Sequence, residues 1–354
     1  MRLTLLVPEL IWPEPADQLT LGKLALPGLA WLTGRSQLDR HPKRAFEAAL
    51  AAQFGLDDAP FGALRLLGEP GSPMVIDGEW LCADPVHLRF HHERIVLADA
   101  GAFDLDLDEA QALTAALNTE FADLGEFHVA DARRWYLRTR LTVNRKFAPI
   151  SQIAGKRLDG ELESEANPLR RWLNEIQMFL HGHPVNAARE AAGKPAVNSL
   201  WLWGPGPLPA ANPQQLTTVW SDNPLAIGLA RSQGVAHQAL PATLADVLDQ
   251  AGRSGHTLVV LDSLLGPVLY ENGEDWRHAS LALDANWLQP AAAALGRRID
   301  TLTLIAPTIY GELHWKLTGG ARWKFWRKGK PIAAMADELA RSPSAQPSSQ
   351  DHAA

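Results

Sequence analysis

The sequence predicts an α/β fold in which a mixed, mostly parallel β-sheet is flanked by helices. One observation is that short apolar, β-prone runs recur along the chain, at residues 3–7, 199–203, 217–220, 257–262 and 302–306. The other is that helical segments separate several of these runs, as at residues 225–233 and 244–251. Strands that alternate with helices indicate a largely parallel sheet covered on both faces.

The individual elements follow from local patterns. Leu3 to Val7 is an apolar run that ends at a proline, which is typical of a buried first strand. Residues 43–54 predict a helix, because apolar positions recur every three or four residues and Gly55 follows. Residues 167–182 predict a second helix, with Pro168 at its first position.

After residue 70 the pattern changes to short β-type runs separated by turn residues, with one helical stretch between them. This pattern predicts a smaller α+β insertion at residues 71–160, within a core made of residues 1–70 and 161–335. The tail, residues 336–354, is rich in Ser, Pro and Gln, and we expect it to be disordered.

Composition and charge favour a soluble cytoplasmic protein. Hydrophobic residues make up 46% and charged residues 21%, which is ordinary for globular chains. The single cysteine, Cys82, excludes an internal disulfide, and Pro8 and Glu9 interrupt the start before a signal-peptide core forms. No apolar run approaches the roughly 20 residues that span a bilayer. A net charge of -7 makes nucleic acid an unexpected partner.

A polar segment between the helix at 167–182 and the run at 199–203 is the first candidate site. It leads into the turn Gly204-Pro205-Gly206, which we expect at the carboxyl end of a strand, where open α/β sheets bind ligands. Its amides and guanidinium can bind a phosphate or carboxylate. The simpler interpretation is that the asparagines satisfy backbone groups of a buried loop. The ligand-binding candidates are Asn186, Arg189, Asn198, Trp201, Trp203, Gly204 and Gly206.

Several ordered motifs carry a family resemblance. They are WLCADPVHL at 80–88, RWYL at 134–137, LNEIQM at 173–178, NSLWLWGPG at 198–206 and WSDNPL at 220–225. With these motifs the chain resembles the RpfE-type regulatory proteins over most of residues 1–335, and more distantly the archaeal-type cofactor-independent phosphoglycerate mutases. The resemblance implies a core similar to the alkaline phosphatase superfamily. There, several Asp and His residues hold two divalent metals, and a Ser or Thr takes the phosphoryl group.

The ligands that this resemblance implies are altered here. In active relatives the first strand ends in an acidic residue followed by Gly, whereas this one runs into Pro8-Glu9. A late strand should end in an adjacent Asp-His pair, but residues 302–306 continue into Pro307-Thr308, and the only such pair is Asp351-His352 in the tail. We therefore expect a degenerate, non-catalytic protein without a cofactor. It would serve a regulatory or ligand-binding role, with a protein partner or a small phosphorylated ligand.

The alternative is an active metal-dependent phosphoglycerate mutase or phosphoesterase with an unusual ligand set. Glu9, Asp262 and one of His181 or His183 would hold a divalent metal, and Ser263 follows the Asp at the end of a strand. Such an Asp more often caps a turn or helix. The two histidines lack a Cys or Glu companion at zinc spacing, which makes them weak metal candidates.

The C-terminal region combines aromatic and basic residues in an otherwise acidic chain, with RWKFWRKGK at residues 322–330. Such a segment can bind an anion, an anionic membrane surface or single-stranded nucleic acid. The simpler interpretation packs the aromatics inward and points the Lys and Arg outward. If exposed, the segment would make the chain an adaptor or membrane-peripheral protein. The candidate patch is Arg322, Trp323, Lys324, Trp326 and Arg327.

Overall fold

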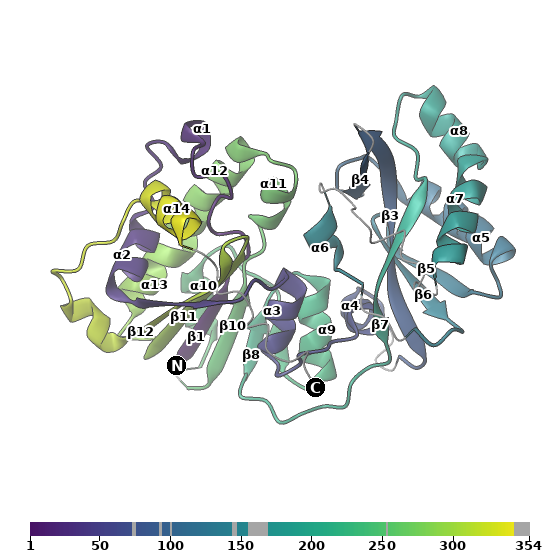
Figure 1. The fold of residues 1–354 in the computed structure, drawn as a ribbon. Helices are drawn as coiled ribbons and strands as arrows, with labels where there is room; N and C mark the ends of the chain where they lie inside the picture. The colour runs from purple at the N-terminus through teal and green to yellow at the C-terminus, as the bar shows by residue number, and fades with distance from the viewer. Residues whose placement is uncertain are drawn as a thin grey trace, which may run out of the picture. The chain divides into compact units, whose positions relative to one another are not determined.

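The computed structural model describes residues 1–72, 76–91, 94–99, 101–143, 147–154, 169–252 and 254–342. The chain divides into two compact units (Figure 1). The first comprises Met1–Gly55, Pro213–Asn223 and Val235–Ala354, and the second comprises Leu56–Asn212 and Pro224–Gly234. The second unit is therefore larger than the insertion expected at residues 71–160.

A seven-stranded mixed sheet forms the centre of the first unit within the described part of the chain, in the order β2–β12–β11–β1–β10–β8–β9. Its parallel strands are β1 (Arg2–Leu6), β8 (Thr218–Trp220), β9 (Ala236–Gln238), β10 (His256–Val260) and β11 (Thr301–Thr308). The antiparallel edge consists of β12 (Gly311–Thr318) and β2 (Gln37–His41). The expectation of a mixed, mostly parallel sheet is confirmed.

Helices of the first unit pack around this sheet because both of its faces are apolar. Leu3, Leu5 and Leu6 of β1 are all buried, as a central parallel strand requires. The helices are α1 (Gln18–Leu21), α2 (Pro27–Arg35), α3 (Phe46–Ala52), α10 (Leu244–Gln250), α11 (Leu265–Leu269), α12 (Gly273–Leu283), the π-helix η1 (Asp284–Leu288), α13 (Gln289–Ala294), the 3₁₀ helix η2 (Gly319–Trp323) and α14 (Ile332–Arg341). The helix predicted at 43–54 is α3.

The C-terminal tail begins later than the sequence suggested. Residues 332–341 form α14, whose Ile332, Met335 and Leu339 are buried against the core of the first unit. Apolar residues at three- and four-residue spacing form the buried face of this helix. The Ser-, Pro- and Gln-rich residues that follow led to the prediction of disorder from residue 336. The prediction of disorder is therefore wrong for residues 336–341, and residues 343–354 lie outside the described part.

The second unit is an antiparallel sheet with helices. Its strands are β3 (Glu79–His91), β4 (Arg94–Asp99), β5 (Gly125–Asp131), β6 (Arg134–Thr139) and β7 (Ser199–Gly206). Its helices are α4 (Phe61–Gly68), α5 (Leu107–Glu120), α6 (Ile150–Ile153), α7 (Arg170–His181), α8 (Pro184–Ala191) and α9 (Pro224–Ser232). The helix predicted at 167–182 is α7, while Pro168 lies outside the described residues.

Strand β7 differs from the prediction. The sequence placed this run in the parallel sheet, but it pairs antiparallel with β3 of the second unit. A continuous apolar run fits any strand that is buried on both faces, so the run alone does not specify its partner. The turn Gly204-Pro205-Gly206 consequently does not lie at the carboxyl end of a parallel strand.

Helices α4 and α9 cross at two glycines. A Cβ added to Gly68 would lie 1.7 Å from the carbonyl oxygen of Pro224, and one added to Gly228 would lie 1.7 Å from that of Leu64. Neither distance is compatible with a side chain, so the helices touch backbone to backbone. Arg231 adds a hydrogen bond across the same pair, donating to the Leu67 carbonyl at 2.7 Å.

Candidate functional site

The carboxyl ends of the parallel strands in the first unit carry polar residues. Glu9 follows β1, Asp222 follows β8, and Asp262 and Ser263 follow β10. Because carboxyl ends of parallel strands meet at the same edge, these residues line one edge of the sheet. This edge is where an open α/β sheet normally holds its ligand.

Two carboxylates at this edge are engaged with neighbouring loops. The Asp262 carboxylate accepts a hydrogen bond of 2.7 Å from the side-chain amide of Asn223. The Asp222 carboxylate accepts one of 3.0 Å from the backbone N–H of Leu240. These bonds tie the segment after β8 to the segments after β10 and β9, so both acids serve to hold the edge together.

Glu9 has an unusual backbone conformation. Its φ is +54°, in the left-handed region that costs a non-glycine residue about 1–2 kcal/mol. Its N–H donates to the Pro307 carbonyl at 2.8 Å, and its own carbonyl accepts from the buried indole of Trp276 at 2.9 Å. These tertiary contacts hold the strained conformation. No sequence pattern announces it, because it depends on residues nearly 300 positions away.

The end of β11 is built of turn contacts. The hydroxyl of Thr308 donates to the Gly311 carbonyl at 2.9 Å, and the Tyr310 N–H donates back to that hydroxyl at 3.1 Å. The Tyr310 phenol donates to the Pro13 carbonyl at 2.8 Å. Burial, together with the negative charge of nearby Glu14, raises the pKa of Tyr310 to about 12, so the phenol stays protonated and keeps this role.

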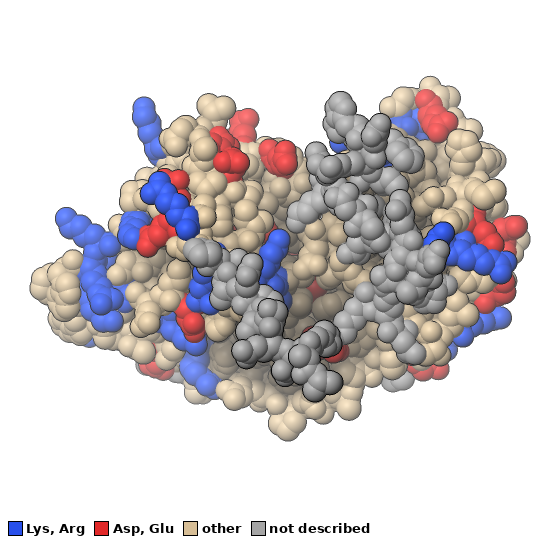
Figure 2. Space-filling model, viewed as in Figure 1, with Lys and Arg blue, Asp and Glu red and all other residues tan. Residues whose placement is uncertain are grey.

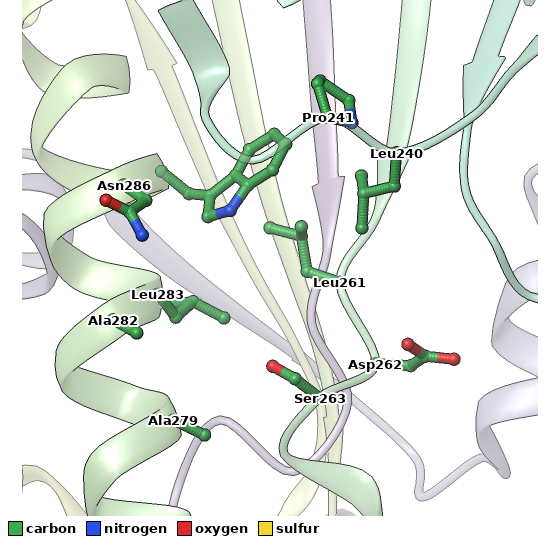
Figure 3. A pocket seen from close by; sticks show the side chains of 10 residues that line it. Leu240, Pro241, Leu261, Asp262, Ser263, Ala279, Ala282, Leu283 and Asn286 are labelled. Carbon is green, nitrogen blue, oxygen red and sulfur yellow. The ribbon is translucent and has the colours of Figure 1, made fainter.

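A small cavity of about 250 Å³ adjoins the same edge (Figure 3). It lies below the roughly 300–1,000 Å³ of sites for drug-sized ligands. In Figure 3 the Ser263 hydroxyl lies on the side of α12, whereas the Asp262 carboxylate points away from that helix. Apolar groups therefore dominate the wall. The lining residues are Leu240, Pro241, Leu261, Asp262, Ser263, Ala279, Ala282, Leu283, Asn286 and Trp287.

Beside the cavity, the π-helix η1 begins with a buried carboxylate, Asp284. This side chain accepts hydrogen bonds from the backbone N–H groups of Gly28 at 3.0 Å and Leu29 at 2.7 Å, at the start of α2. Gln289 also donates to it, at 2.9 Å. A carboxylate is favourable there because it satisfies free N–H groups and faces the positive end of the helix dipole. Asp284 is thus a helix cap supplied from another element.

Among the residues that the structure describes, no three His, Cys, Asp or Glu side chains are grouped so that they could hold a metal ion. Glu9 and Asp262 belong to the first unit, but His181 and His183 belong to the second, so their convergence stays a prediction. His183 accepts the Val185 N–H at 3.2 Å as the cap of α8, and burial lowers its pKa.

In the second unit, Asn186 and Arg189 are buried on α8. The Asn186 amide donates to the carbonyls of Leu180 and Val197, both at 2.8 Å, and accepts from the Val197 N–H. Arg189 donates to the Pro195 carbonyl at 2.8 Å and forms an ion pair with Glu109. Their polar groups therefore fasten the loop before β7 to the helices.

The remaining candidates around β7 are also held by structural contacts. Asn198 exchanges two hydrogen bonds with the backbone of Leu88, at 2.7 and 2.8 Å. The Trp201 indole donates to the Ala148 carbonyl at 2.9 Å. Gly204 has a φ of +63°, and a Cβ there would lie 2.6 Å from the Phe61 side chain. Gly206 has a φ of +134° and packs in the same way against Pro60.

Trp203 leads to a buried charged cluster that the sequence did not reveal. Its indole donates to Asp84 at 2.7 Å, and Asp84 also receives two hydrogen bonds from Arg65, at 2.6 and 3.0 Å. Arg65 further donates to the Tyr136 hydroxyl, which donates to Glu69 at 2.6 Å. Arg134 completes the cluster by pairing with Glu69 at 2.7 Å.

The pKa of Arg65 reflects its place in this cluster. Burial disfavours its charge, but the adjacent Asp84 carboxylate outweighs that effect, and the pKa lies well above its ordinary value. No local sequence pattern could have revealed the cluster, because its members come from α4, the residue directly after α4, β3, β6 and β7.

The C-terminal patch is exposed, which overturns the interpretation that its aromatics pack inward. Trp323, Phe325 and Trp326 expose 66%, 76% and 67% of their surface. Trp315, on β12 before the patch, is buried. Within the described residues, no helix has the length and apolar character to cross a membrane.

No family model matches the chain. Two curated proteins are similar to part of it. The 2,3-bisphosphoglycerate-independent phosphoglycerate mutase 2 of Methanothermobacter thermautotrophicus is 32% identical over 126 residues, covering 34% of this chain and 31% of that protein. The 2,3-bisphosphoglycerate-independent phosphoglycerate mutase of Methanosarcina barkeri is 28% identical over 146 residues, covering 38% and 36%.

The chain is therefore distantly related to cofactor-independent phosphoglycerate mutases, and it spans about a third of the length of the curated relatives it matches. Its fold is similar to that of the PH0037 protein from Pyrococcus horikoshii. That likeness has a TM-score of 0.55 at 13% identity and covers 98% of this chain and 99% of the other. At such low identity it concerns the fold alone.

Proposed function

We propose that this chain is a degenerate relative of the cofactor-independent phosphoglycerate mutases that does not catalyse their reaction and acts instead as a regulatory or ligand-binding protein. This role would match the RpfE-type family that its sequence resembles. The observation that supports the proposal is that polar side chains at the carboxyl edge of the first unit's sheet form hydrogen bonds with neighbouring loops.

Metal-assisted phosphoryl transfer needs several hard ligands around each ion and a positioned nucleophile. At this edge Asp222 and Asp262 bind loop groups, and the end of β11 offers Thr308 and Tyr310, which hold a turn and the segment at Pro13. These groups support a stable loop scaffold. The Ser263 hydroxyl and the Asn286 amide at the cavity are neutral, and they suit the orientation of a small polar ligand rather than acid–base chemistry.

The test is an assay of the purified full chain for interconversion of 3-phosphoglycerate and 2-phosphoglycerate, with Mg²⁺, Mn²⁺ or Zn²⁺ added. The Methanothermobacter relative, run in parallel, controls for the assay conditions. We expect no turnover above the rate without protein. Metal-dependent turnover that is lost in Asp262→Asn, but kept in Asp249→Asn at an exposed carboxylate of the same unit, would refute the proposal.

Ligand binding is measured separately, by calorimetric titration with 3-phosphoglycerate as the probe. A small phosphorylated ligand that uses the cavity should bind the wild-type chain and fail to bind Ser263→Trp, because the new ring fills the space between β10 and α12. Ser263 is exposed, so this variant should keep its thermal unfolding midpoint. Equal binding by both proteins would exclude the cavity as the site.

An active phosphoglycerate mutase or phosphoesterase with an unusual ligand set is the second candidate, and the conformation of Glu9 favours it. Strained backbone tends to occur at functional sites, and Glu9 lies where a strand of the parallel sheet ends. If this candidate is correct, Glu9→Gln should abolish metal-dependent turnover at unchanged stability. The protein should then also retain a divalent metal through purification with Asp262 as a second ligand.

A further inference from the structure

A short segment after β12 concentrates positive charge and exposed aromatic surface. We define the basic aromatic loop as Arg322 to Lys330. It contains five basic residues and no acidic one, in a chain of net charge -7. Four aromatic side chains are exposed in the described part of the chain, and three of them lie in this loop. Large exposed aromatics that are clustered in this way mark interaction surfaces.

The loop is anchored at both ends. At its start, Ala321 is buried and its carbonyl accepts the Lys324 N–H at 3.1 Å. Near its end, Gly329 lies directly against α2, because a Cβ there would fall 1.8 Å from the Ala30 carbonyl oxygen. Gly34 of α2 shows the same contact, with a Cβ position 2.4 Å from the Gly329 nitrogen. The aromatic side chains therefore project from a fixed piece of backbone.

The charges of the loop are largely uncompensated. Lys330 pairs with Glu338 of α14. Among the residues that the structure describes, no acidic side chain lies within ion-pair distance of Arg322, Lys324, Arg327 or Lys328. Figure 2 shows Lys and Arg side chains gathered at the left edge, where Figure 1 places the yellow-green chain between β12 and α14.

We propose that the basic aromatic loop docks the first unit on an anionic lipid bilayer. Trp rings are favourable at the level of the headgroups, and a neighbouring Phe can enter the boundary with the acyl chains. Lys and Arg near the surface add attraction to anionic lipids. The loop supplies both signals within a few residues, and this inference is independent of the catalytic state of the protein.

The ring geometry favours a bilayer over single-stranded nucleic acid. Base stacking needs open ring faces, but the Arg322 guanidinium lies 4.9 Å from the centre of the Trp323 ring and covers one face. Phe325 and Trp326 meet edge to face, with centres 5.2 Å apart and planes at 82°. A polyanion that extended beyond the loop would also meet the acidic remainder of the chain. Salt screens charges more than about 8 Å away, so the loop's own basic residues dominate the attraction to an anionic surface that contacts it.

The experiment is flotation of the full chain with unilamellar vesicles. One set is phosphatidylcholine alone, and the other contains phosphatidylcholine and phosphatidylserine in equal parts. We expect binding to the anionic vesicles that weakens with added salt, and much less binding to the neutral ones. The variant Arg322→Glu, Lys324→Glu, Arg327→Glu should bind at least on the order of 100-fold more weakly, since the loss of each basic residue near an anionic surface removes about a factor of five and each new Glu adds repulsion.

The matched control is Lys43→Glu, Arg133→Glu, Arg171→Glu, which changes the net charge equally at three exposed positions outside the loop and should float like the wild type. A second variant, Trp323→Ser, Phe325→Ser, Trp326→Ser, should lose the binding that persists at high salt. Equal binding by the charge-reversed loop and its control would overturn the proposal. So would retention of a single-stranded oligonucleotide by a wild-type chain that does not float with anionic vesicles.

Discussion

Asp84→Ala should destabilise the second unit by about 3–5 kcal/mol, the cost of removing one partner from a buried ion pair. The magnitude follows from what the change leaves behind. Arg65 would lose the acceptor of two hydrogen bonds, at 2.6 and 3.0 Å, and the Trp203 indole would lose one at 2.7 Å. Each buried donor left without an acceptor costs about 1–3 kcal/mol, and the guanidinium would keep its charge without its nearest counterion.

Differential scanning calorimetry measures this effect. For a domain of 150–250 residues each kcal/mol shifts the melting temperature by about 2–4 °C, so the transition of the second unit should fall by roughly 6–20 °C. The control is Glu175→Gln, which breaks the exposed Arg171–Glu175 pair on α7 and should leave the transition nearly unchanged. A loss below about 0.5 kcal/mol for Asp84→Ala, as at an ordinary surface position, would refute the reasoning.

A double variant distinguishes the cost of leaving Arg65 without its ion-pair partner from the cost of removing side-chain volume at residue 84. Arg65→Met with Asp84→Leu replaces both charges by apolar groups, and buried pairs replaced in this way often retain stability. We expect it to recover most of the loss seen with Asp84→Ala. If both proteins are equally unstable, packing around Trp203 rather than the unpaired charge is responsible for the effect.

Two further predictions concern packing and pH. Gly228→Ala should cost about 1–3 kcal/mol or more by forcing α4 and α9 apart, whereas Gly266→Ala, which meets open space, should be near neutral in the same denaturant titration. Burial, with a smaller effect of Arg2, lowers the pKa of His256 from its ordinary value of 6.5. The unfolded chain therefore takes up this proton first, and stability should fall as pH drops below about 6.5. His256→Gln should remove that part of the slope, and identical pH profiles for the two proteins would contradict the assignment.

Much of the fold could be predicted from local patterns. The run at residues 3–7 is apolar because β1 is buried between two parallel neighbours, and the helices α3 and α7 show their inward faces in the spacing of apolar residues. Strand β7 shows the limit of this approach. Its apolar run signalled a buried strand, but its pairing with β3 depends on a register between segments more than 100 residues apart.

The candidate site was predictable only in part. Glu9, Asp262 and Ser263 could be named as site candidates because they follow predicted buried strands, and polar residues after parallel strands lie at the carboxyl edge of the sheet. Their local roles were not predictable, since the acceptor role of Asp262 depends on Asn223, which lies in the segment after β8. Trp276 gave no sign that it would be buried and would donate to the Glu9 carbonyl.

The sequence by itself determined the fold class, the main helices, the distant kinship with phosphoglycerate mutases and the charge of the C-terminal segment. These properties rest on periodicity, composition and ordered motifs, all of which are local or additive. Only the tertiary structure decided which polar side chains are engaged in structural hydrogen bonds and which aromatics reach the surface. Those outcomes depend on partners from distant segments, as when Gly329 packs on α2 and leaves Trp323 and Trp326 exposed.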